Sequence, residues 1–418
     1  MIQHIFKIIW TERKINSWIT LELVLVFCIL WFCVDYISFF VMRYFEPRGY
    51  STEHVYTVDL GMKEEVANSD SQAYKDSLFI DLQTIVERIK KYPDIEAASL
   101  SLAATPYSNS FSNESVMIDS VEEYAQIKTV TPDFFKVFGI NVLRGNPTDW
   151  NNRNTVFISG DKDNLFVRKE AMQIKTFNVT GRSEPVQMQV AGVIEPSKRS
   201  EFDPAWSIIY ILLAKNDKRL AHYGTIELCL RVKAGADKNF IPRFTKDMQE
   251  QLSVDPYYLS SVNPINDLRK DYMKWNGYDN DFKSILSIST FLFINIFLAV
   301  VGTFWFRIQT RRGEIGLRVA LGSTRINIKA LFIIETLILL LLASLIATVV
   351  CVNITVADIV KDIGVPSIDR GANPATFSQY VIDYCITFFI LMIIAVAAVW
   401  YPARKASEIP PAEALHDE

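Results

Sequence analysis

Long apolar runs alternate with stretches of mixed polarity along the chain. Four runs are nearly free of charged side chains, and they cover residues 17–42, 284–306, 330–353 and 380–401. A bilayer core about 30 Å thick needs roughly 20 residues of helix to cross it. The pattern therefore predicts four transmembrane helices, which we place at 17–42, 281–306, 329–353 and 379–402.

The first run differs from a cleaved signal peptide. Its apolar part is too long, and bulky residues at 40–45 follow it where a cleavage site requires small ones. Trp31 and Phe32 precede Cys33, which excludes a lipoprotein signal on the same ground. We expect an uncleaved anchor. The preceding segment 1–16 is either an amphipathic helix at the membrane surface or a disordered basic leader.

The positions of Lys and Arg predict the orientation of the chain. Basic residues lie beside the spans in segments 1–16, 307–328 and 403–418, whereas the short segment 354–378 carries two of them against three Asp. Positive charge in short loops marks the cytoplasmic side. We therefore expect both termini and 307–328 to be cytoplasmic, 354–378 to be an outer loop, and the long segment 43–280 to lie outside.

Segment 43–280 mixes period-2 and period-3.6 patterns, which is typical of an α/β domain, and its length suffices for two subdomains. We expect strands at 54–60, 124–130, 176–180, 186–194, 207–213 and 225–232, and helices at 78–91 and 239–252. Thr131 is expected to cap a helix that begins at Pro132. Segment 265–283 is either a helical stalk continuing the second span or a loop.

Composition supports a membrane protein and offers no catalytic motif. Hydrophobic residues make up 50% of the chain, which is high for a soluble enzyme, and the net charge of −4 argues against a nucleic-acid partner. Only Cys229 of five cysteines lies outside the spans. No phosphate loop, zinc-protease or nucleophile-elbow motif occurs, and the four histidines are scattered. We expect no catalytic residue, metal or cofactor in this chain.

Several polar residues fall inside the predicted spans. Glu22 and Glu335 lie about one turn from the cytoplasmic ends, and Asp35 and Asp383 lie near the outer ends. Buried charges are costly in lipid and can mark ion pathways, but all four can reach headgroups or water, so we favour anchoring or helix pairing. Asn295 is mid-span, where a hydrogen bond to another helix and ordinary packing are equal alternatives.

A charged, glycine-containing stretch separates the second and third spans. Residues 311–325 read RRGEIGLRVALGSTR, and Glu314 precedes Arg318 by four, the favourable order for a helical ion pair. Gly322 is expected to end this helix, and Ser323 or Thr324 to cap the next. Such an elbow suits docking into a groove of a soluble partner. A loop whose arginines bind lipid phosphates is the equal alternative.

At these residues the chain resembles the MacB/FtsX-type permeases of ABC transporters, the mechanotransmission class. Their loop typically reads R-x-R-E-I-G-x-R-x-A-L-G-A, against 311–323 here. Residues 332–335, 402–415 and 130–139 also agree. The family often has a glycine pair where Ala343-Ser344 stands, and no nucleotide-binding domain is fused to these residues, which implies a separate ATPase.

The resemblance implies a permease dimer, of identical or paralogous chains, driven by cytoplasmic ATPases that bind ATP and Mg. Segment 307–328 would be the coupling helix. Its polar contacts would come from Glu314 and the arginines, and Ile315 and Leu317 would fill the groove. The implied coupling residues are Arg311, Arg312, Glu314, Ile315, Leu317, Arg318, Ala320, Leu321 and Gly322.

The resemblance also implies that the chain is not an enzyme by itself and resides in a bacterial inner membrane. It would export or extract an antimicrobial, peptide or lipoprotein, with membrane lipids and a periplasmic adaptor or client as further partners. The alternative is a regulatory permease that activates an outside enzyme, such as a cell-wall hydrolase, or senses antibiotic. A membrane-anchored enzyme with its site in 43–280 is a third hypothesis.

Overall fold

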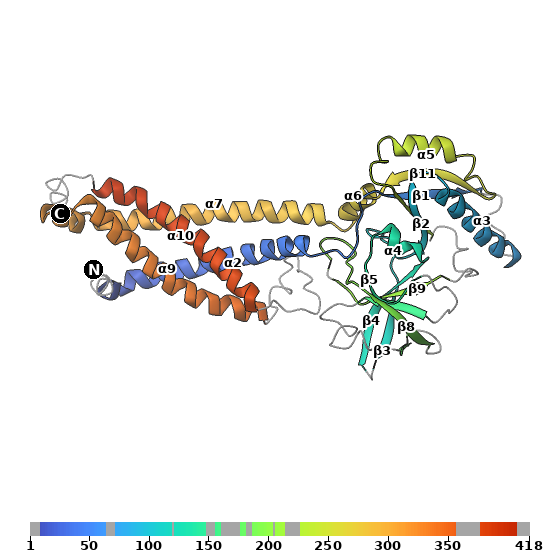
Figure 1. Ribbon diagram of the computed structural model, residues 1–418. Coiled ribbons are helices and arrows are strands. Elements are labelled where there is room, and N and C mark those ends of the chain that lie inside the picture. Colours follow the sequence, from blue (N-terminus) through green and yellow to red (C-terminus); the bar gives the residue numbers. More distant parts are fainter. Residues whose placement is uncertain are drawn as a thin grey trace. The chain divides into compact units, whose positions relative to one another are not determined.

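The chain folds into two compact units, Met1–Met42 with Asp279–Glu418, and Arg43–Tyr278. We call them the membrane unit and the inserted domain, and Figure 1 shows their elements. The computed structural model describes residues 9–63, 72–118, 121–147, 155–159, 176–180, 186–203, 205–213, 226–356 and 377–407. Most of the predicted leader, outer loop and C-terminal tail lies outside these ranges.

The membrane unit consists of long apolar helices. They are α2 (Arg13–Phe45), α7 (Tyr278–Thr310), α8 (Arg312–Ala320), α9 (Arg325–Val356) and α10 (Phe377–Ser407). All of them except the short α8 are long and apolar enough to cross a membrane. This confirms the four predicted spanning helices, one before the inserted domain and three after it.

Small side chains let α9 and α10 pack closely. Ala343, Ser344 and Ala347 of α9 and Ala395 of α10 are all fully buried. The three alanines lie in a core that also contains Trp31 of α2, and the Ser344 hydroxyl lies 3.1 Å from the Tyr384 hydroxyl of α10. Their short side chains allow the two helices to approach closely.

Within the described residues, the inserted domain is built on one continuous sheet of eleven strands. In chain order the strands are β1 (Val55–Met62), β2 (Ile95–Leu102), β3 (Asn113–Ile118), β4 (Val121–Val130), β5 (Val142–Arg144), β6 (Thr155–Ser159), β7 (Thr176–Val179), β8 (Val186–Ile194), β9 (Ile208–Leu212), β10 (Glu227–Val232) and β11 (Tyr257–Pro264). The helices are α3 (Gln72–Lys90), α4 (Asp133–Val137), α5 (Phe240–Met248) and α6 (Ile265–Trp275). The domain thus mixes helices with strands, as predicted.

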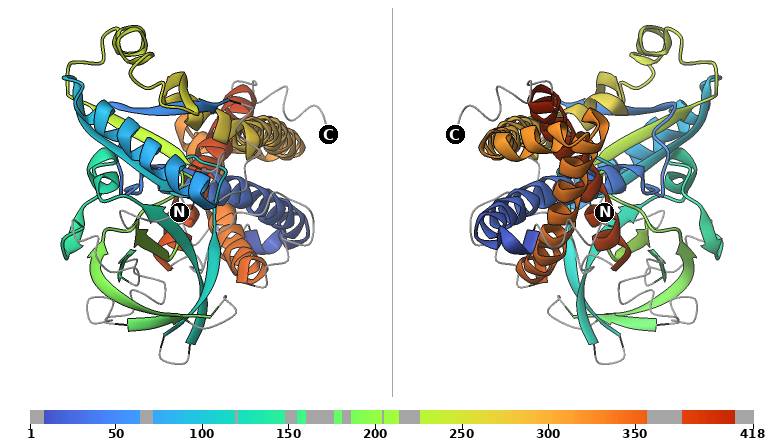
Figure 2. Two further views of the ribbon diagram at one scale, coloured as in Figure 1. Left: turned by 90° about the vertical axis from the view of Figure 1, so that its right-hand side faces the viewer. Right: turned by 90° about the vertical axis from the view of Figure 1, so that its left-hand side faces the viewer.

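The strand pairing divides this sheet into an open part and a ring. The open part runs β11–β1–β10–β2–β4, and the ring runs β4–β3–β7–β8–β6–β9 and closes because β9 pairs with β4. Most pairs are antiparallel, and the parallel ones are β4–β9 and β6–β8. One hydrophobic core lies between the open part and helices α3 and α5, and strand side chains form a second core inside the ring. A third core, around Phe134 and Tyr210, contains residues of both parts. Figure 2 shows α3 along the open sheet and the curved strands of the ring.

The structure decides two local predictions, the cap of α4 and the form of segment 265–283. Thr131 does not cap α4 through its side chain, contrary to the prediction; its hydroxyl instead accepts a hydrogen bond of 3.1 Å from the Leu100 N–H, which ties β4 to β2. Segment 265–283 is helical but interrupted, because α6 ends at Trp275 and α7 begins at Tyr278. Gly277 lies between them with a φ of +76°, a conformation that favours glycine.

Candidate functional site

The elbow, which we define as residues 307–328, joins α7 to α9 through the short helix α8. Gly322 ends α8 with a φ of +92°, and its N–H donates to the Val319 carbonyl at 3.0 Å. The Ser323 N–H donates to the Arg318 carbonyl at 2.9 Å, which completes a Schellman cap. Thr324 caps α9, since its hydroxyl accepts from the Asn327 N–H at 3.3 Å. Both predicted helix signals are confirmed.

A buried ionic cluster holds the elbow to the rest of the membrane unit. Arg307 of α7 donates to one carboxylate oxygen of Glu335 at 2.5 Å, and Arg311 donates to the other at 2.9 Å. The three residues are 5%, 8% and 1% exposed, respectively. Glu335 lies on α9, so one carboxylate joins α9 to both the end of α7 and the start of α8.

Further contacts extend this cluster to α2 and along α8. Arg307 also donates to the side-chain oxygen of Asn16 at 2.8 Å, which ties in α2. Arg311 donates to Glu314 at 2.7 Å, and Arg318 donates to the other oxygen of Glu314 at 2.6 Å. Burial lowers the pKa of Arg311, but the hydrogen bond to Glu314 and the nearby carboxylates outweigh it and raise the pKa overall. Arg311 therefore stays charged.

This arrangement turns the side chains of two of the expected coupling residues inward. Arg311 points into the cluster and stacks over the Phe332 ring at 5.2 Å, instead of facing a partner. Ile315 is 3% exposed and packs in the core of the membrane unit, so it does not fill a partner's groove in this conformation. Arg318 and Glu314 remain partly exposed, at 25% and 36% of their side chains. The side chain of Arg312 lies outside the described residues.

The opposite side of α8 presents apolar side chains. Leu317 is 51% exposed, Leu321 is 79% exposed, and Ala320 between them is also exposed. Positions 317, 320 and 321 share one helical face by their spacing of three and four. We call these three residues the elbow face. One side of α8 is thus fixed by buried charges and the other is open and apolar.

The remaining predicted polar positions serve mainly to pair helices. Thr303 of α7 donates to the Glu22 carboxylate of α2 at 2.8 Å, and Ser38 of α2 donates to Asp383 of α10 at 2.6 Å. These contacts agree with helix pairing. Asn295 is exposed on α7 and donates to the carbonyl of Phe291 in its own helix at 2.7 Å, so its described contact does not reach another helix.

Sequence reasoning missed Arg307 and Asn16 as parts of the cluster. A signal for Arg307 was present, because it precedes Arg311 by four residues and so falls on the same helical face. No local pattern marks Asn16, which reaches Arg307 across 291 positions of the sequence.

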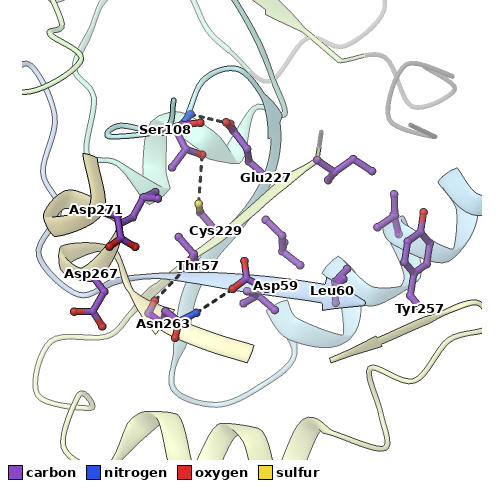
Figure 3. A pocket seen from close by; sticks show the side chains of 16 residues that line it. Thr57, Asp59, Leu60, Ser108, Glu227, Cys229, Tyr257, Asn263, Asp267 and Asp271 are labelled. Atoms are coloured by element: carbon purple, nitrogen blue, oxygen red, sulfur yellow. Dashed lines mark hydrogen bonds between the residues drawn. The ribbon is translucent and has the colours of Figure 1, made fainter. Parts of the chain in front are cut away.

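The inserted domain contains a separate pocket of about 620 Å³, shown in Figure 3. Acidic side chains from β1, β10 and α6 line it, namely Asp59, Glu227, Asp267 and Asp271. One oxygen of Glu227 accepts hydrogen bonds from the Ser101 hydroxyl and from the N–H groups of Ala104 and Thr105 at 2.8–3.0 Å. This oxygen of Glu227 is thus hydrogen-bonded within the inserted domain. Within the described ranges, no group of three or more His, Cys, Asp or Glu side chains is placed to hold a metal ion.

Cys229 also lines this pocket. Burial raises the pKa of its thiol to about 12, so the thiol is protonated at neutral pH.

Comparison with known proteins identifies the membrane unit. Residues 286–411 match the family model described as FtsX-like permease C-terminal. This segment is therefore similar to the C-terminal domain of FtsX-like permeases. The match covers most of α7 and all of α8 and α9, so it includes the whole elbow, and it confirms the resemblance given by the RRGEIGLRVALGS motif. It supports a role as an ABC transporter permease, and permeases of this family generally work with a cytoplasmic ATPase.

Two solved structures are similar to about half of the chain at low levels. One is a domain assigned to a permease of Porphyromonas gingivalis, with 14% identity and a TM-score of 0.31, covering 51% of this chain and 92% of that one. The other is the extracellular domain of the noncanonical ABC-type transporter YknZ from Gram-positive bacteria, with 11% identity and a TM-score of 0.30, covering 49% and 100%. These scores are too low to establish a shared fold. No curated protein matches the chain in sequence.

Proposed function

We propose that the chain is the permease subunit of an ABC-type transporter, and that it transmits the motion of a separate cytoplasmic ATPase from the elbow to the inserted domain. ATP and Mg would be bound by the ATPase. The inserted domain would act outside a bacterial inner membrane, with the elbow and both termini in the cytoplasm. The expected cargo is an antimicrobial, a peptide or a lipoprotein taken from the outer side.

The observation that carries the proposal is the two-sided construction of α8. Its inner side is tied to α2, α7 and α9 by the Arg307–Glu335–Arg311 cluster. Its outer side is the elbow face, where Leu317 and Leu321 leave apolar surface uncovered. Burying one such side chain against a partner stabilises a complex by about 1.5–3 kcal/mol. A docked ATPase would thus bind to α8, and α8 would move together with α2, α7 and α9.

Helix α7 provides the path from the elbow to the inserted domain. It runs without interruption over 33 residues, from Tyr278 to Thr310, which corresponds to about 50 Å of helix. Thr310 lies at the elbow and Tyr278 belongs to the inserted domain. A tilt imposed on α8 would therefore reach the inserted domain through one rigid element, and no channel for the cargo through the bilayer would be required.

We also propose that two permease chains act together. Helix α7 has only 11% of its most apolar window buried within this chain, against 33–39% for the other spanning helices. Much of its surface, including the exposed Asn295, is therefore available to lipid or to a second permease chain.

The test is co-purification of the tagged chain from native membranes, with identification of bound proteins by mass spectrometry. The informative variant is Leu317→Glu, which puts a charge on the elbow face. The matched control is Leu143→Glu on β5, because Leu143 is 49% exposed and Leu317 is 51% exposed. We expect a stoichiometric protein with a phosphate-loop motif, lost in Leu317→Glu and kept in Leu143→Glu.

Two results would contradict the proposal. Recovery of the wild-type chain without any ATPase at normal expression would mean that the elbow face contacts lipid. Equal ATPase recovery with Leu317→Glu and with wild type would show that the ATPase binds elsewhere. Recovery of a wall hydrolase together with the ATPase would keep the transmission mechanism and replace the cargo by a regulated enzyme.

A further inference from the structure

The segment between β8 and β9 buries an unusual number of polar residues. We call residues 196–203 the clasp. Ser197, Lys198, Ser200 and Glu201 of the clasp are between 0% and 5% exposed. Loops normally run over the surface, and buried polar groups are tolerated when they are hydrogen-bonded or paired. The contacts described below join the clasp to two further segments of the inserted domain, Arg43–Tyr278, and they show what the clasp holds.

The first partner is the chain that leaves α2. The Lys198 ammonium donates to the carbonyl of Arg43 at 2.9 Å and lies 2.5 Å from the Glu46 carboxylate. The Lys198 N–H donates to the carbonyl of Arg48 at 2.9 Å. Gly49 has a φ of +75°, and a Cβ there would lie 2.0 Å from the Pro196 carbonyl oxygen. The clasp and the segment after α2 therefore touch backbone to backbone.

The second partner is the region where α6 ends and α7 begins. Asp203 accepts a hydrogen bond from the Tyr272 hydroxyl of α6 at 2.8 Å. Its other oxygen accepts from the Tyr278 hydroxyl, also at 2.8 Å, and Tyr278 is the first residue of α7. Glu201 lies 2.6 Å from the Arg269 guanidinium of α6 and 3.5 Å from that of Arg48, so it bridges both partners.

One aromatic side chain joins the two helix ends directly. The Phe202 ring lies 5.9 Å from the ring of Tyr44, in the last turn of α2, and 5.5 Å from the ring of Tyr278. These centroid distances are typical of interacting aromatic pairs. Phe202 therefore lies between the residue where the chain leaves one span and the residue where it enters the next.

The clasp is also fixed to the ring of the inserted domain. It is continuous with β8 before it and leads into β9 after it. The Ser197 hydroxyl lies 2.9 Å from the hydroxyl of Tyr210, a fully buried residue of β9. A displacement of either helix end would consequently pull on strands that are closed into a ring.

We propose that the clasp is the coupling joint of the inserted domain: Lys198, Phe202 and Asp203 hold the end of α2 and the start of α7 together and pass their displacement to β8 and β9. These are positioning residues, and they act on the transmission proposed above, on which this inference rests. The chain passes between the membrane unit and the inserted domain after Met42 and after Tyr278, and the clasp contacts inserted-domain residues at both places.

The first experiment tests the joint without any partner protein. Amide hydrogen exchange would be measured by mass spectrometry on the full chain in lipid nanodiscs, over residues 279–285 of α7. The variants are Tyr44→Ala, Phe202→Ala and the double variant, and the control is Tyr124→Ala, an aromatic side chain on β4 that is 70% exposed. Unchanged exchange in β9 would verify that each variant is folded.

We expect both single variants to speed exchange at 279–285 by roughly three- to tenfold. The double variant should exchange no faster than Phe202→Ala alone, because Tyr44 would reach α7 only through Phe202. Independent, multiplying effects would overturn the proposal, as would a Tyr44→Ala effect confined to α2. Asp203→Asn, which keeps the side-chain shape, should also speed exchange at 279–285 if Phe202→Ala fails to fold.

The second experiment separates the joint from the proposed function. Exchange would be compared with and without vanadate-trapped ATP in the chain co-purified with its ATPase. The clasp variant Phe202→Ala should keep the ATPase and the nucleotide effect at the elbow, and should lose the nucleotide effect in β8 and β9. An undiminished effect in β8 and β9 would refute the joint. Absence of an ATPase from the wild-type sample would refute the proposed function, whereas the first experiment would still decide on the joint.

Discussion

Removal of the Glu335 carboxylate should release the elbow from the membrane unit. Glu335→Ala deletes the group that pairs with both Arg307 and Arg311. The two guanidinium groups would keep their buried positions, since they are only 5% and 8% exposed, and would lose their shared counter-charge. Arg307 would keep its bond to Asn16 and Arg311 its bond to Glu314.

The expected cost follows from burial. Breaking a buried ion pair by removing one partner typically costs about 3–5 kcal/mol, because the remaining charge is left uncompensated. Exposed pairs would require a large discount for solvent screening, but these side chains are nearly inaccessible. A cost of about 3–5 kcal/mol for freeing α8 corresponds to roughly 10²- to 4 × 10³-fold faster amide exchange in that helix, at about 1.4 kcal/mol per factor of ten.

The assay is hydrogen exchange of α8 in the full chain in nanodiscs, read by mass spectrometry. Asn295→Ala is the matched control, because Asn295 also lies within a span but is exposed and bonds only to its own helix among the described contacts. Glu335→Gln should have a smaller effect than Glu335→Ala, since the amide oxygen can still accept one hydrogen bond. Exchange in the inserted domain should not change in any of these variants.

An α8 exchange rate in Glu335→Ala within threefold of wild type would refute this reasoning. It would show that packing of residues such as Ile315 fixes α8 and that the cluster contributes little. If the Glu335→Ala protein is lost from the membrane, Glu335→Gln provides the same readout, because it keeps the shape of the side chain.

Three further predictions concern the inserted domain. Gly49→Ala should speed amide exchange in the clasp far more than Gly235→Ala. Both glycines have a positive φ, but only at Gly49 would the added Cβ clash with a neighbour, since it would lie 2.0 Å from the Pro196 carbonyl oxygen. Equal effects of the two substitutions would contradict this close approach. Burial lowers the pKa of Lys128 from 10.5 to about 8. Between these two values the unfolded chain binds more protons than the folded chain, so the free energy of unfolding should rise with pH across that window. Lys128→Met should therefore slow amide exchange in β4 at pH 7, by up to about 3 kcal/mol in opening free energy, and faster exchange would contradict this. The pKa of the Cys229 thiol is raised to about 12. In a variant whose other cysteines are serine, Cys229 should therefore react with maleimide at pH 8 roughly 10³-fold more slowly in the folded chain than in the denatured chain. Similar rates would show that the thiol is accessible.

The hydrophobic pattern predicted the elements that have either a long apolar run or a regular alternation of buried and exposed side chains. The spanning helices were predictable because apolar runs of this length are typical of helices that cross a bilayer, and β8 was predictable because its side chains alternate between inside and outside. Strand β2 was missed because nearly all of its side chains are buried, so the period-2 signal is absent. The pairing of β4 with β9, which closes the ring, joins distant segments and leaves no local trace.

At the elbow, the sequence indicated the helix boundaries but gave no sign that Arg311 is buried. Gly322 and Thr324 act through the backbone within a few residues, so their roles can be deduced locally. The direction of Arg311 depends on Glu335, which lies 24 positions away on another helix. In the structure the Arg311 side chain is buried, whereas the Arg318 side chain is partly exposed.

The use of charge inside the elbow fits the proposed transmission of motion through α8. Apolar packing of similar volume often stabilises a protein as much as a buried ion pair does, so stability alone does not account for Arg307, Arg311 and Glu335. Apolar surfaces, however, slide over one another at little cost, because the hydrophobic effect is not directional. Each oxygen of Glu335 instead accepts from a different arginine, and hydrogen bonds of this kind weaken steeply when their angle changes. The cluster therefore resists rotation and sliding of α8 against α9, and those are the movements by which a push on Leu317 and Leu321 would otherwise be lost before it reached α7.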